Sequence, residues 1–578
     1  MRLASLCVAA ALAALAVLPA RVAGIDQITR RGKYLYRPDG TRFYIKGIAY
    51  QESAPTESDS ETGGFPEPTS FEDPLALPAA CTRDVPYLQQ LGVNTIRVYS
   101  VDSQRDHSSC MRTFEEAGIY VILDLGLPVN GSINRAEPSW DTALLEQYLS
   151  TVEAFGQYDN VLAYNVANEV VTTDATTAAL PFVRAAVRDV KSYLRSRGRS
   201  SLVAYSATDG PSGPSGRRSS VARYLSCGDE AEAVDLLGIN SYSWCGNSNA
   251  AAAGFDDLAS DFEQLPVATY FAEFGCATQG ADARPWTEVA ALFSPPMTDS
   301  FSGGVAFTYF PKDPEAAGRD YGIVAFASDA GNDGDVRQRS DFGALADQFR
   351  NATGPAAPPS PEPTTSTTCP SQSDSFLAAE ALPPTPDIQL CQCMEDSAWS
   401  CLPTTRTAGD SDAIGTLFDS VCGLLDRNDA PVGCDEALTA DGAAGVYGNW
   451  SMCAPAQRLS WAFDAYWQLF RNEPSANACN FDTQATLRAD PTNNDADAAA
   501  ATASCIAGNQ APTAVFTPQL PSSTASSSGG GSGGSGGGSG GNTGSGASTG
   551  GGPDAATAPA LSLLAVAAAF GAGAFILL

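Results

Sequence analysis

The sequence predicts an α/β fold, a (β/α)8 TIM barrel followed by a small, disulfide-rich, mainly helical module. Eight short apolar segments alternate with helical stretches up to about residue 310, and a Pro/Thr-rich linker then leads into a cysteine-rich region. Near-continuous apolar strands suit a parallel sheet that is buried on both faces, and eight such β–α units match the barrel. A doubly wound open sheet is the alternative, but no glycine-rich phosphate turn follows the first segment.

The predicted strands span residues 43–50, 93–100, 120–126, 160–168, 202–208, 234–242, 266–273 and 304–310. The segments between them include 82–91, 111–117, 142–155 and 178–197, where apolar residues recur at helical spacing. The alternation of strand and helix therefore runs through most of the first 310 residues.

Two of the predicted strands end in a glutamate. The segment NVLAYNVANEV (160–170) delivers Asn168 and Glu169, and PVATYFAEFG (266–275) delivers Glu273. Barrel enzymes take their catalytic groups from the C-terminal ends of the strands. Strands four and seven lie three apart in the ring, so the two carboxylates can face each other across the mouth. Such a pair indicates a glycosidase, although either glutamate alone could be a surface residue that begins a helix.

Further polar residues lie at or near the ends of other predicted strands: Gln51, Tyr99, Asp124, Tyr242 and Tyr309. Any one of them could sit on the barrel rim without a function. Their common position at one end of the strands favours a binding cleft there.

Composition excludes several classes of function. The chain carries 65 acidic and 33 basic residues, a net charge of −32, and phosphates of nucleic acid would be repelled. Its one histidine, His107, leaves little scope for a Ser–His–Asp triad or a histidine-rich metal site. We expect His107 to be a solvated loop or helix-start residue, and we predict no metal and no cofactor.

The two ends of the chain carry targeting signals. Residues 1–24 have Arg2, an apolar run and small residues, as in a secretory signal peptide. At the other end, a Ser/Gly-rich stalk (513–552) precedes an apolar tail (553–578), which predicts a glycosylphosphatidylinositol (GPI) anchor at Ser548, Gly550 or Gly551. A tail-anchored span is the alternative. We expect the protein on the extracellular face of the plasma membrane.

The cysteines predict disulfides. Of fifteen, Cys7 leaves with the signal peptide and an even number remains. N-x-S/T acceptors for glycosylation stand at Asn130, Asn351 and Asn449. Eight cysteines between residues 386 and 512, after a linker at 351–385, predict a disulfide-scaffolded module. Its aromatic residues either stack on sugars or fill a small core: Trp450, Trp461, Tyr466 and Trp467.

Several ordered motifs resemble a known family. FYIKGIAYQ, LGVNTIRVYS, YVILDL, NVANEV, GINSY, FAEFGC and FSGGVAFTYF are similar, in this order, to the fungal β-1,3-glucanosyltransferases, glycoside hydrolase family 72. The resemblance covers residues 25–350. The segments GNWSMC and LSWAFDAYW resemble the cysteine-rich carbohydrate-binding module, family 43, of one branch of that family.

The resemblance implies a monomeric, GPI-anchored wall-remodelling enzyme without a cofactor. It would cut an internal β-1,3-glucan linkage by a retaining mechanism and join the new reducing end to the non-reducing end of another chain. An endo-β-1,3-glucanase and a non-catalytic wall-binding protein are the alternatives.

The resemblance also implies roles for individual residues. Glu169 would be the acid/base and Glu273 the nucleophile, Asn168 would bind the sugar 2-hydroxyl, and Tyr242 would orient Glu273. The residues implied for sugar subsites are Gln51, Tyr99, Asp124 and Tyr309, with Tyr321 for acceptor stacking. The implied barrel disulfides are Cys81–Cys110, Cys227–Cys369 and Cys245–Cys276. The remaining cysteines would pair within the module, in an order left open: Cys391, Cys393, Cys401, Cys422, Cys434, Cys453, Cys479 and Cys505.

The chain departs from the family pattern at two places. FGCATQGADARPW lacks the asparagine that usually follows the FGC motif, and Thr308 stands where a glutamate commonly precedes the tyrosine of strand eight. Both departures concern subsites and leave the two carboxylates in place.

Overall fold

The computed structural model describes residues 24–521, except 53, 55, 58–66, 129–130, 278–283, 313–319, 328–333, 360–364, 366–367, 474–476 and 493. Several predicted features lie outside the described residues: the predicted signal peptide up to residue 23, the predicted glycosylation acceptor Asn130, the stalk from residue 522, the apolar tail, and the predicted anchor residues Ser548, Gly550 and Gly551.

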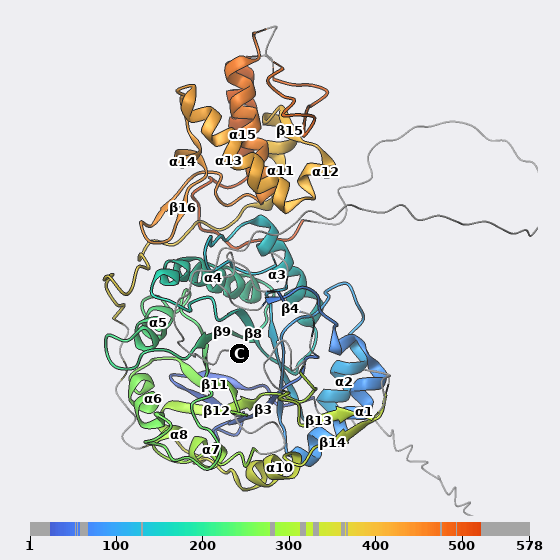
Figure 1. The fold of residues 1–578 in the computed structure, drawn as a ribbon, viewed down its shortest axis with the longest axis vertical. Helices are drawn as coiled ribbons and strands as arrows, with labels where there is room; N and C mark the ends of the chain where they lie inside the picture. Colours follow the sequence, from blue (N-terminus) through green and yellow to red (C-terminus); the bar gives the residue numbers. More distant parts are fainter. Residues whose placement is uncertain are drawn as a thin grey trace, which may run out of the picture. The chain divides into compact units, whose positions relative to one another are not determined.

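Eight parallel strands close into a barrel (Figure 1). They are β3 (Ile45–Ala49), β6 (Thr95–Val98), β7 (Tyr120–Asp124), β8 (Val161–Asn168), β9 (Leu202–Thr208), β10 (Leu236–Asn240), β11 (Ala268–Phe274) and β12 (Phe301–Ala306). Each strand pairs with its neighbour in the sequence, and β12 pairs with β3 to close the ring. The predicted barrel is confirmed.

The eighth strand was predicted too late in the chain. It begins at Phe301 and ends at Ala306, whereas the prediction was 304–310. Gly303 and Gly304 hide its first half from a pattern search because glycine is rare inside strands. Gly303 is needed there, since its φ is +87° and a Cβ would lie 2.2 Å from the carbonyl oxygen of Ile45. The segment after Ala306 therefore belongs to the barrel mouth.

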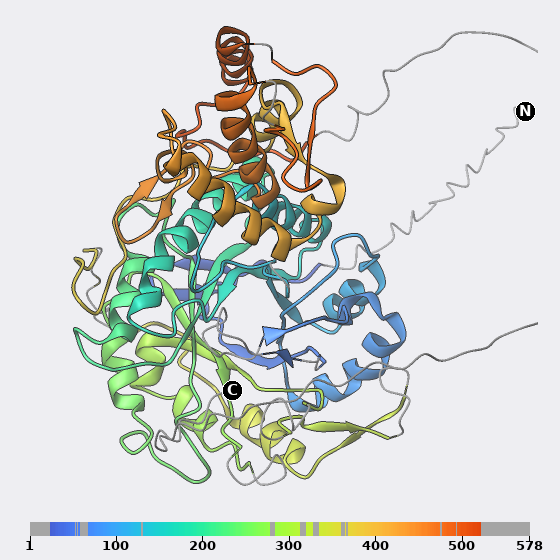
Figure 2. The ribbon, with the colours of Figure 1, turned by 45° about the horizontal axis from the view of Figure 1, so that its top comes forward.

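Helices surround the barrel (Figure 2). They are α1 (Pro78–Leu91), α2 (Ser108–Glu116), α3 (Thr142–Phe155), α4 (Leu180–Ser196), α5 (Arg217–Ser226), α6 (Phe255–Phe262), α7 (Glu288–Leu292), α8 (Met297–Ser300) and α10 (Phe342–Asn351). The four predicted helical stretches correspond to α1–α4. Short 3₁₀ helices precede α1 and α4, η1 (Pro74–Ala76) and η2 (Ala175–Ala179).

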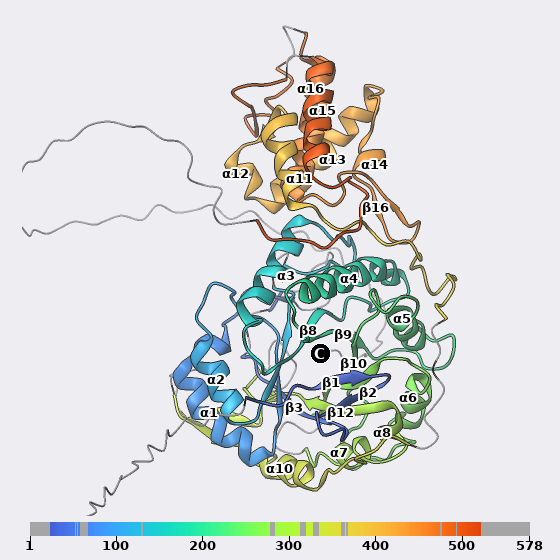
Figure 3. The same ribbon diagram turned by 180° about the vertical axis from the view of Figure 1, so that it is seen from behind.

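The strands carry apolar side chains on both faces. In β9, Val203 and Tyr205 pack toward the helices, while Leu202 and Ala204 belong to the cluster inside the barrel. The N-terminal hairpin β1 (Thr29–Arg31) and β2 (Tyr34–Tyr36) contributes Leu35 to that inner cluster and covers one end of the barrel (Figure 3). Inner side chains and hairpin fill this end, so chemistry is confined to the C-terminal ends of the strands.

Two further hairpins lie in the loops after β3 and β12. They are β4 (Thr56–Glu57) with β5 (Glu67–Pro68), and β13 (Val324–Phe326) with β14 (Val336–Gln338). Both follow strands of the barrel at its C-terminal end.

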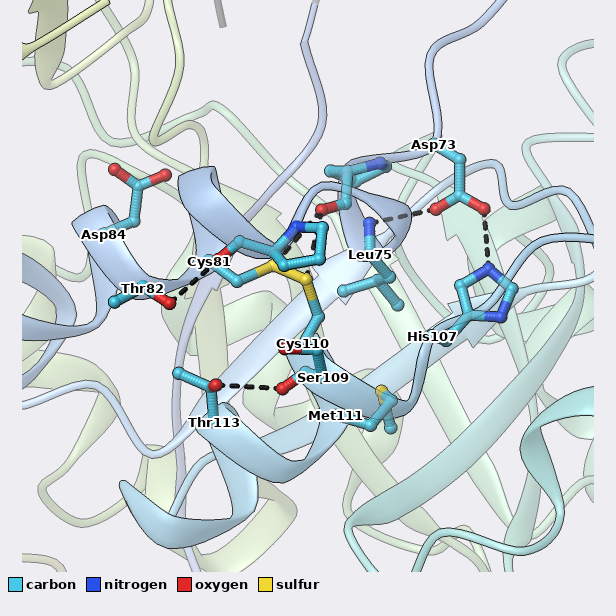
Figure 4. Close-up of a disulfide and its surroundings, with 12 residues drawn as sticks. Asp73, Leu75, Cys81, Thr82, Asp84, His107, Ser109, Cys110, Met111 and Thr113 are labelled. Carbon is cyan, nitrogen blue, oxygen red and sulfur yellow. Dashed lines mark hydrogen bonds and ion pairs between the residues drawn. A yellow bond between two sulfur atoms is a disulfide. The ribbon is translucent and has the colours of Figure 1, made fainter. Parts of the chain in front are cut away.

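His107 corrects one prediction. It precedes α2, as expected of a helix-start residue, but it is 2% exposed and not solvated. Its Nε2 lies 2.8 Å from Oδ2 of Asp73 (Figure 4). Its ring centroid lies 4.3 Å from that of Phe155. A carboxylate 34 residues away satisfies the imidazole, and this contact leaves no trace in the local polar sequence.

The cysteine-rich module is mainly helical. Its elements are α11 (Ile388–Cys393), the π-helix η5 (Met394–Ala398), β15 (Cys401–Pro403), α12 (Thr405–Ala408), α13 (Ser411–Arg427), α14 (Cys434–Ala437), β16 (Ala440–Asp441), β17 (Val446–Tyr447), α15 (Pro455–Phe470), β18 (Ala485–Leu487) and α16 (Asp495–Gly508). Trp450, Trp461 and Trp467 are buried, and Tyr466 packs against Phe470, which favours a core role for these aromatics.

Among the described helices of the chain, none is long and apolar enough to cross a membrane.

Seven disulfides join the described cysteines. Three lie in or on the barrel and are the pairs that the resemblance implies: Cys81–Cys110 (Figure 4), Cys227–Cys369 and Cys245–Cys276. The module pairs, which the sequence left open, are Cys391–Cys453, Cys393–Cys505, Cys401–Cys479 and Cys422–Cys434.

We expect the Cys227–Cys369 bond to contribute more stability than a short-range bond. Its cysteines are 142 residues apart, whereas Cys422 and Cys434 are 12 apart. In the chain-entropy account, loops of these sizes differ by about 2 kcal/mol in stabilisation. Replacing both cysteines of the long-range pair by serine should lower the melting temperature more than the same change in the short-range pair. Calorimetry of the two variants tests this, and the reverse order would contradict it.

Polar contacts tie the linker and the module to α3 and α4. Oγ1 of Thr385 donates to Asp189 Oδ1 (2.8 Å), and Arg188 Nη1 donates to the carbonyl of Pro383 (2.9 Å). At the start of α3, the amide of Thr142 donates to the carbonyl of Met452 (2.9 Å). These bonds fix the linker and one edge of the module on the outer helices α3 and α4.

Candidate active site

Glu273 is the most constrained carboxylate at the barrel mouth. It lies near the end of β11 and is 7% exposed. The hydroxyls of Tyr99 and Tyr242 each donate to it at 2.8 Å, one to Oε1 and the other to Oε2. Arg97 Nη1 donates to Oε1 at 3.2 Å. Three donors from the ends of two strands, β6 and β10, leave this carboxylate a single orientation.

Arg97 organises the floor of the site. It is fully buried in β6, and its guanidinium binds both oxygens of Asp124, at 3.1 and 2.7 Å. Its Nη2 also donates to Oδ1 of Asn168 at 2.9 Å. Arg97 was not among the site residues predicted from the sequence. The available signal was a cation inside an apolar strand, on the same face as Tyr99 two residues later.

Glu169 stands directly after β8 with its main chain held on both sides. Its amide donates to the carbonyl of Ser206 (2.9 Å), and its carbonyl accepts from Arg135 Nε (2.8 Å). The residue has φ +53°, a left-handed conformation that costs a non-glycine residue about 1–3 kcal/mol. These two bonds offset that strain and fix the direction in which the carboxyl points.

The environment of Glu169 favours its protonated form. Burial and the nearby Glu273 carboxylate raise the pKa of Glu169 to about 7. The side-chain N–H of Asn240 donates to Oε1 of Glu169 at 2.7 Å, and this bond acts in the opposite direction. The side chain is partly open to solvent at the mouth, so its proton can exchange.

Asn240 connects the two carboxylates. It lies opposite Glu273 in the register of β10 and β11, and its amide also donates to Oδ1 of Asn168 (3.2 Å). Asn168 in turn accepts from Arg97, which binds Glu273. The pair thus belongs to one hydrogen-bonded network. Asn240 was also not predicted from the sequence, because within GINSY it is one of several polar residues and nothing local distinguishes it.

An aromatic ring lies beside the nucleophile candidate. The Phe307 ring centroid is 6.5 Å from that of Tyr99 and 6.1 Å from that of Tyr242, edge-on to both. Phe307 is partly exposed and immediately follows β12. It is the aromatic residue of strand eight that reaches the site, a position that the resemblance assigned to Tyr309.

Several residues expected to line sugar subsites have other roles here. Tyr309 is fully buried, and its hydroxyl donates to Asp84 (3.0 Å), so it cannot touch a sugar. Asp124 is occupied by Arg97. Gln51 is 6% exposed, with its amide bonded to the carbonyl of Glu72 (2.7 Å) and its oxygen to the amide of Ser100 (3.2 Å). A residue's position at a strand end does not show whether it is buried. Burial decides which of these residues can line the cleft.

Tyr321 is also buried, at 3% exposure. Its ring lies edge-on to those of Phe307 and Tyr242, at 5.6 and 6.1 Å between centroids. In this structure it supports the aromatic side of the site and presents little surface for acceptor stacking. Thr308, the departure from the family pattern, is fully buried and donates to the carbonyl of Ala49 (3.0 Å).

The chain is similar to known protein families and to characterised fungal proteins over most of its length. Residues 19–353 match the glucanosyltransferase family and residues 399–486 the X8 domain family. The chain is 38% identical over 470 residues to 1,3-beta-glucanosyltransferase gas1 of Schizosaccharomyces pombe, covering 80% of this chain and 79% of that protein. It is 37% identical over 439 residues to 1,3-beta-glucanosyltransferase GAS2 of Saccharomyces cerevisiae, covering 74% of each. It is 38% identical over 460 residues to pH-responsive protein 2 of Candida albicans, covering 79% and 77%.

The chain is also similar to solved structures of a protein from this family. Gas2p of Saccharomyces cerevisiae, as a ligand-free point mutant, matches with a TM-score of 0.69 at 33% identity, over 83% of this chain and 97% of that one. The mutant in complex with laminaritetraose and laminaripentaose matches with a TM-score of 0.68 at 31% identity, over 84% and 98%. The similarity therefore covers the barrel and the module together.

Proposed function

Because the chain belongs to the glucanosyltransferase family, we propose that it remodels cell-wall β-1,3-glucan as a retaining transglycosylase. It cleaves an internal β-1,3 linkage and transfers the new reducing end to the non-reducing end of a second chain. The observation that carries the proposal is the pair of strand-end carboxylates in unlike surroundings. Glu273 accepts three hydrogen bonds, while the pKa of Glu169 is raised to about 7.

This difference suits the two steps of a retaining mechanism. In the first step an oxygen of Glu273 attacks the anomeric carbon, and Glu169 gives its proton to the departing glycosidic oxygen. A glycosyl ester on Glu273 remains. In the second step Glu169, now a carboxylate, removes the proton from an acceptor hydroxyl, whose oxygen displaces Glu273. The Nδ2 atom of Asn168 is available for the sugar 2-hydroxyl because its Oδ1 is engaged by Arg97 and Asn240.

The experiment that tests the proposal is a product analysis with reduced laminari-oligosaccharides of defined length, using secreted protein that ends before Ser522. Products longer than the starting chain, with β-1,3 linkages, are expected. Only shorter products would mean that water resolves the ester and that the enzyme is an endo-β-1,3-glucanase. No change at all would favour a wall-binding protein.

The sequences at the two ends of the chain support a location outside the cell. The signal-like residues 1–24 and the stalk with its apolar tail support secretion and GPI anchoring at Ser548, Gly550 or Gly551, with glycosylation at Asn130, Asn351 and Asn449. Asn351 and Asn449 are exposed, as acceptors must be. The partners are then donor and acceptor glucan chains outside the cell, with the enzyme acting as a monomer. Mass analysis of the protein released by a GPI-specific phospholipase tests the anchor.

Asn240 gives a specific pH prediction. Its N–H stabilises the charged form of Glu169, so Asn240→Ala should raise the pKa of that carboxyl. The alkaline limb of the kcat profile should then move to higher pH, with a loss in kcat of about tenfold because a hydrogen bond to a charged group is removed. A pH series on both proteins measures this. A limb displaced to lower pH would contradict the assigned role of Glu169.

A further inference from the structure

Lys312 differs from every other lysine of the chain. The chain has four lysines. The other three bind main-chain carbonyls through their ammonium groups: Lys33 that of Glu263, Lys46 that of Phe349, and Lys191 those of Glu230 and Ala233. Among the described residues, the ammonium of Lys312 has neither a hydrogen-bond acceptor nor a carboxylate within ion-pair distance. Only its main-chain amide is bonded, to Asp320 (3.0 Å).

This ammonium lies inside the mouth of the barrel. Its Nζ is 5.4 Å from the ring centroid of Phe307, the aromatic that contacts both tyrosines of Glu273. The charges that act on it are Glu273, from β11, and Glu52, from the segment after β3. Lys312 is partly buried, and burial lowers its pKa to about 8, against the attraction of the two carboxylates. A partly desolvated donor without an acceptor is unfavourable unless a ligand supplies one.

The position in the ring assigns Lys312 to one side of the cleft. Glu169, the proton donor of the proposed function, follows β8, so the leaving fragment must lie on that side. In the barrel order β8, β9, β10, β11, β12, the strand before Lys312 is four places from β8 and hence opposite to it. The sugar that stays bonded to Glu273 therefore extends toward β12 and β3, the strands that precede Lys312 and Glu52.

We propose that Lys312 is a donor-binding residue, whose ammonium hydrogen-bonds hydroxyls of the β-1,3-glucan fragment on the non-reducing side of the cleaved linkage. The inference rests on the proposed function. Lys312 would hold the donor both before cleavage and in the glycosyl ester, so it governs how tightly the donor binds. It does not select between water and the acceptor, which approach from the side of Glu169.

Kinetics of Lys312→Met and Lys312→Arg test this inference, with Lys46→Met as the matched control. Lys46 is also partly buried with a lowered pKa, but its ammonium points to the main chain of α10. Lys312→Met should raise the KM for the donor laminari-oligosaccharide about tenfold, as expected for loss of a charged donor. Lys312→Arg should remain within threefold of the wild type, and Lys46→Met should leave KM unchanged. The ratio of transfer to hydrolysis should stay the same in all three variants.

The pH dependence is a second readout. In the wild type, donor affinity should fall above about pH 8 as Lys312 loses its proton, and in Lys312→Met this dependence should vanish. An unchanged donor KM in folded Lys312→Met overturns the inference, and so does a changed transfer ratio at constant donor KM, which would place the residue on the acceptor side. If the wild type itself does not act on β-1,3-glucan, the proposed function has failed instead. The two failures are thus distinguishable.

Discussion

Glu273→Gln is expected to abolish both transfer and hydrolysis, with a loss of at least about 10⁴-fold in kcat, because the covalent route is removed. The substitution preserves the shape of the side chain. The amide oxygen can still accept from Arg97 and Tyr99, and the hydroxyl of Tyr242 can rotate to accept from the new NH2 group. The variant should therefore fold and bind oligosaccharide while failing to form a glycosyl ester.

Mass spectrometry after a rapid quench with an aryl β-laminarioside measures the ester directly. In the wild type, the peptide that contains Glu273 should gain the mass of the laminari-oligosaccharyl group that the substrate carries. The variant should show no such gain. Glu230→Gln, a change at an exposed residue outside the mouth, is the control and should behave as the wild type. Turnover at the wild-type rate by folded Glu273→Gln would refute the nucleophile assignment.

The sequence predicted the strands and both carboxylates because each depends on a local pattern. A buried parallel strand needs an apolar run, and Glu169 and Glu273 stand at the ends of two such runs. The order of the barrel follows from the order of the strands, since each pairs with its neighbour. Local pattern failed at β12, where two glycines interrupt the run.

The remaining features depend on contacts between distant residues. Arg97 and Asn240 acquire their roles from partners 27 to 176 positions away, which no local pattern reports. Tyr309 and His107 were misjudged for the same reason. Each is polar in a polar or mixed context, yet each is buried against one carboxylate from another segment, Asp84 and Asp73 respectively. Sequence located the strand ends but not which of their side chains face the cleft.

Glu169→Ala should lower kcat for β-1,3-glucan by about 10²–10⁴-fold, the usual contribution of a general acid–base group. An aryl β-laminarioside with a good leaving group needs no proton, so its glycosyl ester should form and then accumulate. Azide needs no general base and should release that ester as the β-glycosyl azide, with the configuration retained. The α-azide would instead mean that azide attacked the substrate directly, and that Glu169 was the nucleophile.

The pH dependence of kcat/KM can distinguish the titration of Glu169 from that of other buried carboxyls. Because the pKa of Glu169 is raised to about 7, wild-type kcat/KM for glucan should fall as pH rises above 7. Glu288 in α7 is the matched control, since burial also raises the pKa of this carboxyl to about 7, but α7 lies outside the strand ends. Glu288→Gln should leave the alkaline limb unchanged. A shift of the alkaline limb in Glu288→Gln would mean that the limb reports the titration of Glu288 and not that of Glu169.

The same shift has a consequence for stability. A carboxyl with a higher pKa in the folded than in the unfolded state binds more protons when folded, so its contribution is complete below about pH 4.5 and is lost as pH rises through about 7. Glu169→Gln removes a charge that is poorly placed at high pH. The variant should therefore melt at a higher temperature than the wild type at pH 8, with a smaller difference at pH 5. A difference that grew toward acidic pH would contradict the raised pKa. Such a gain would show that the charged form of Glu169 destabilises the folded barrel.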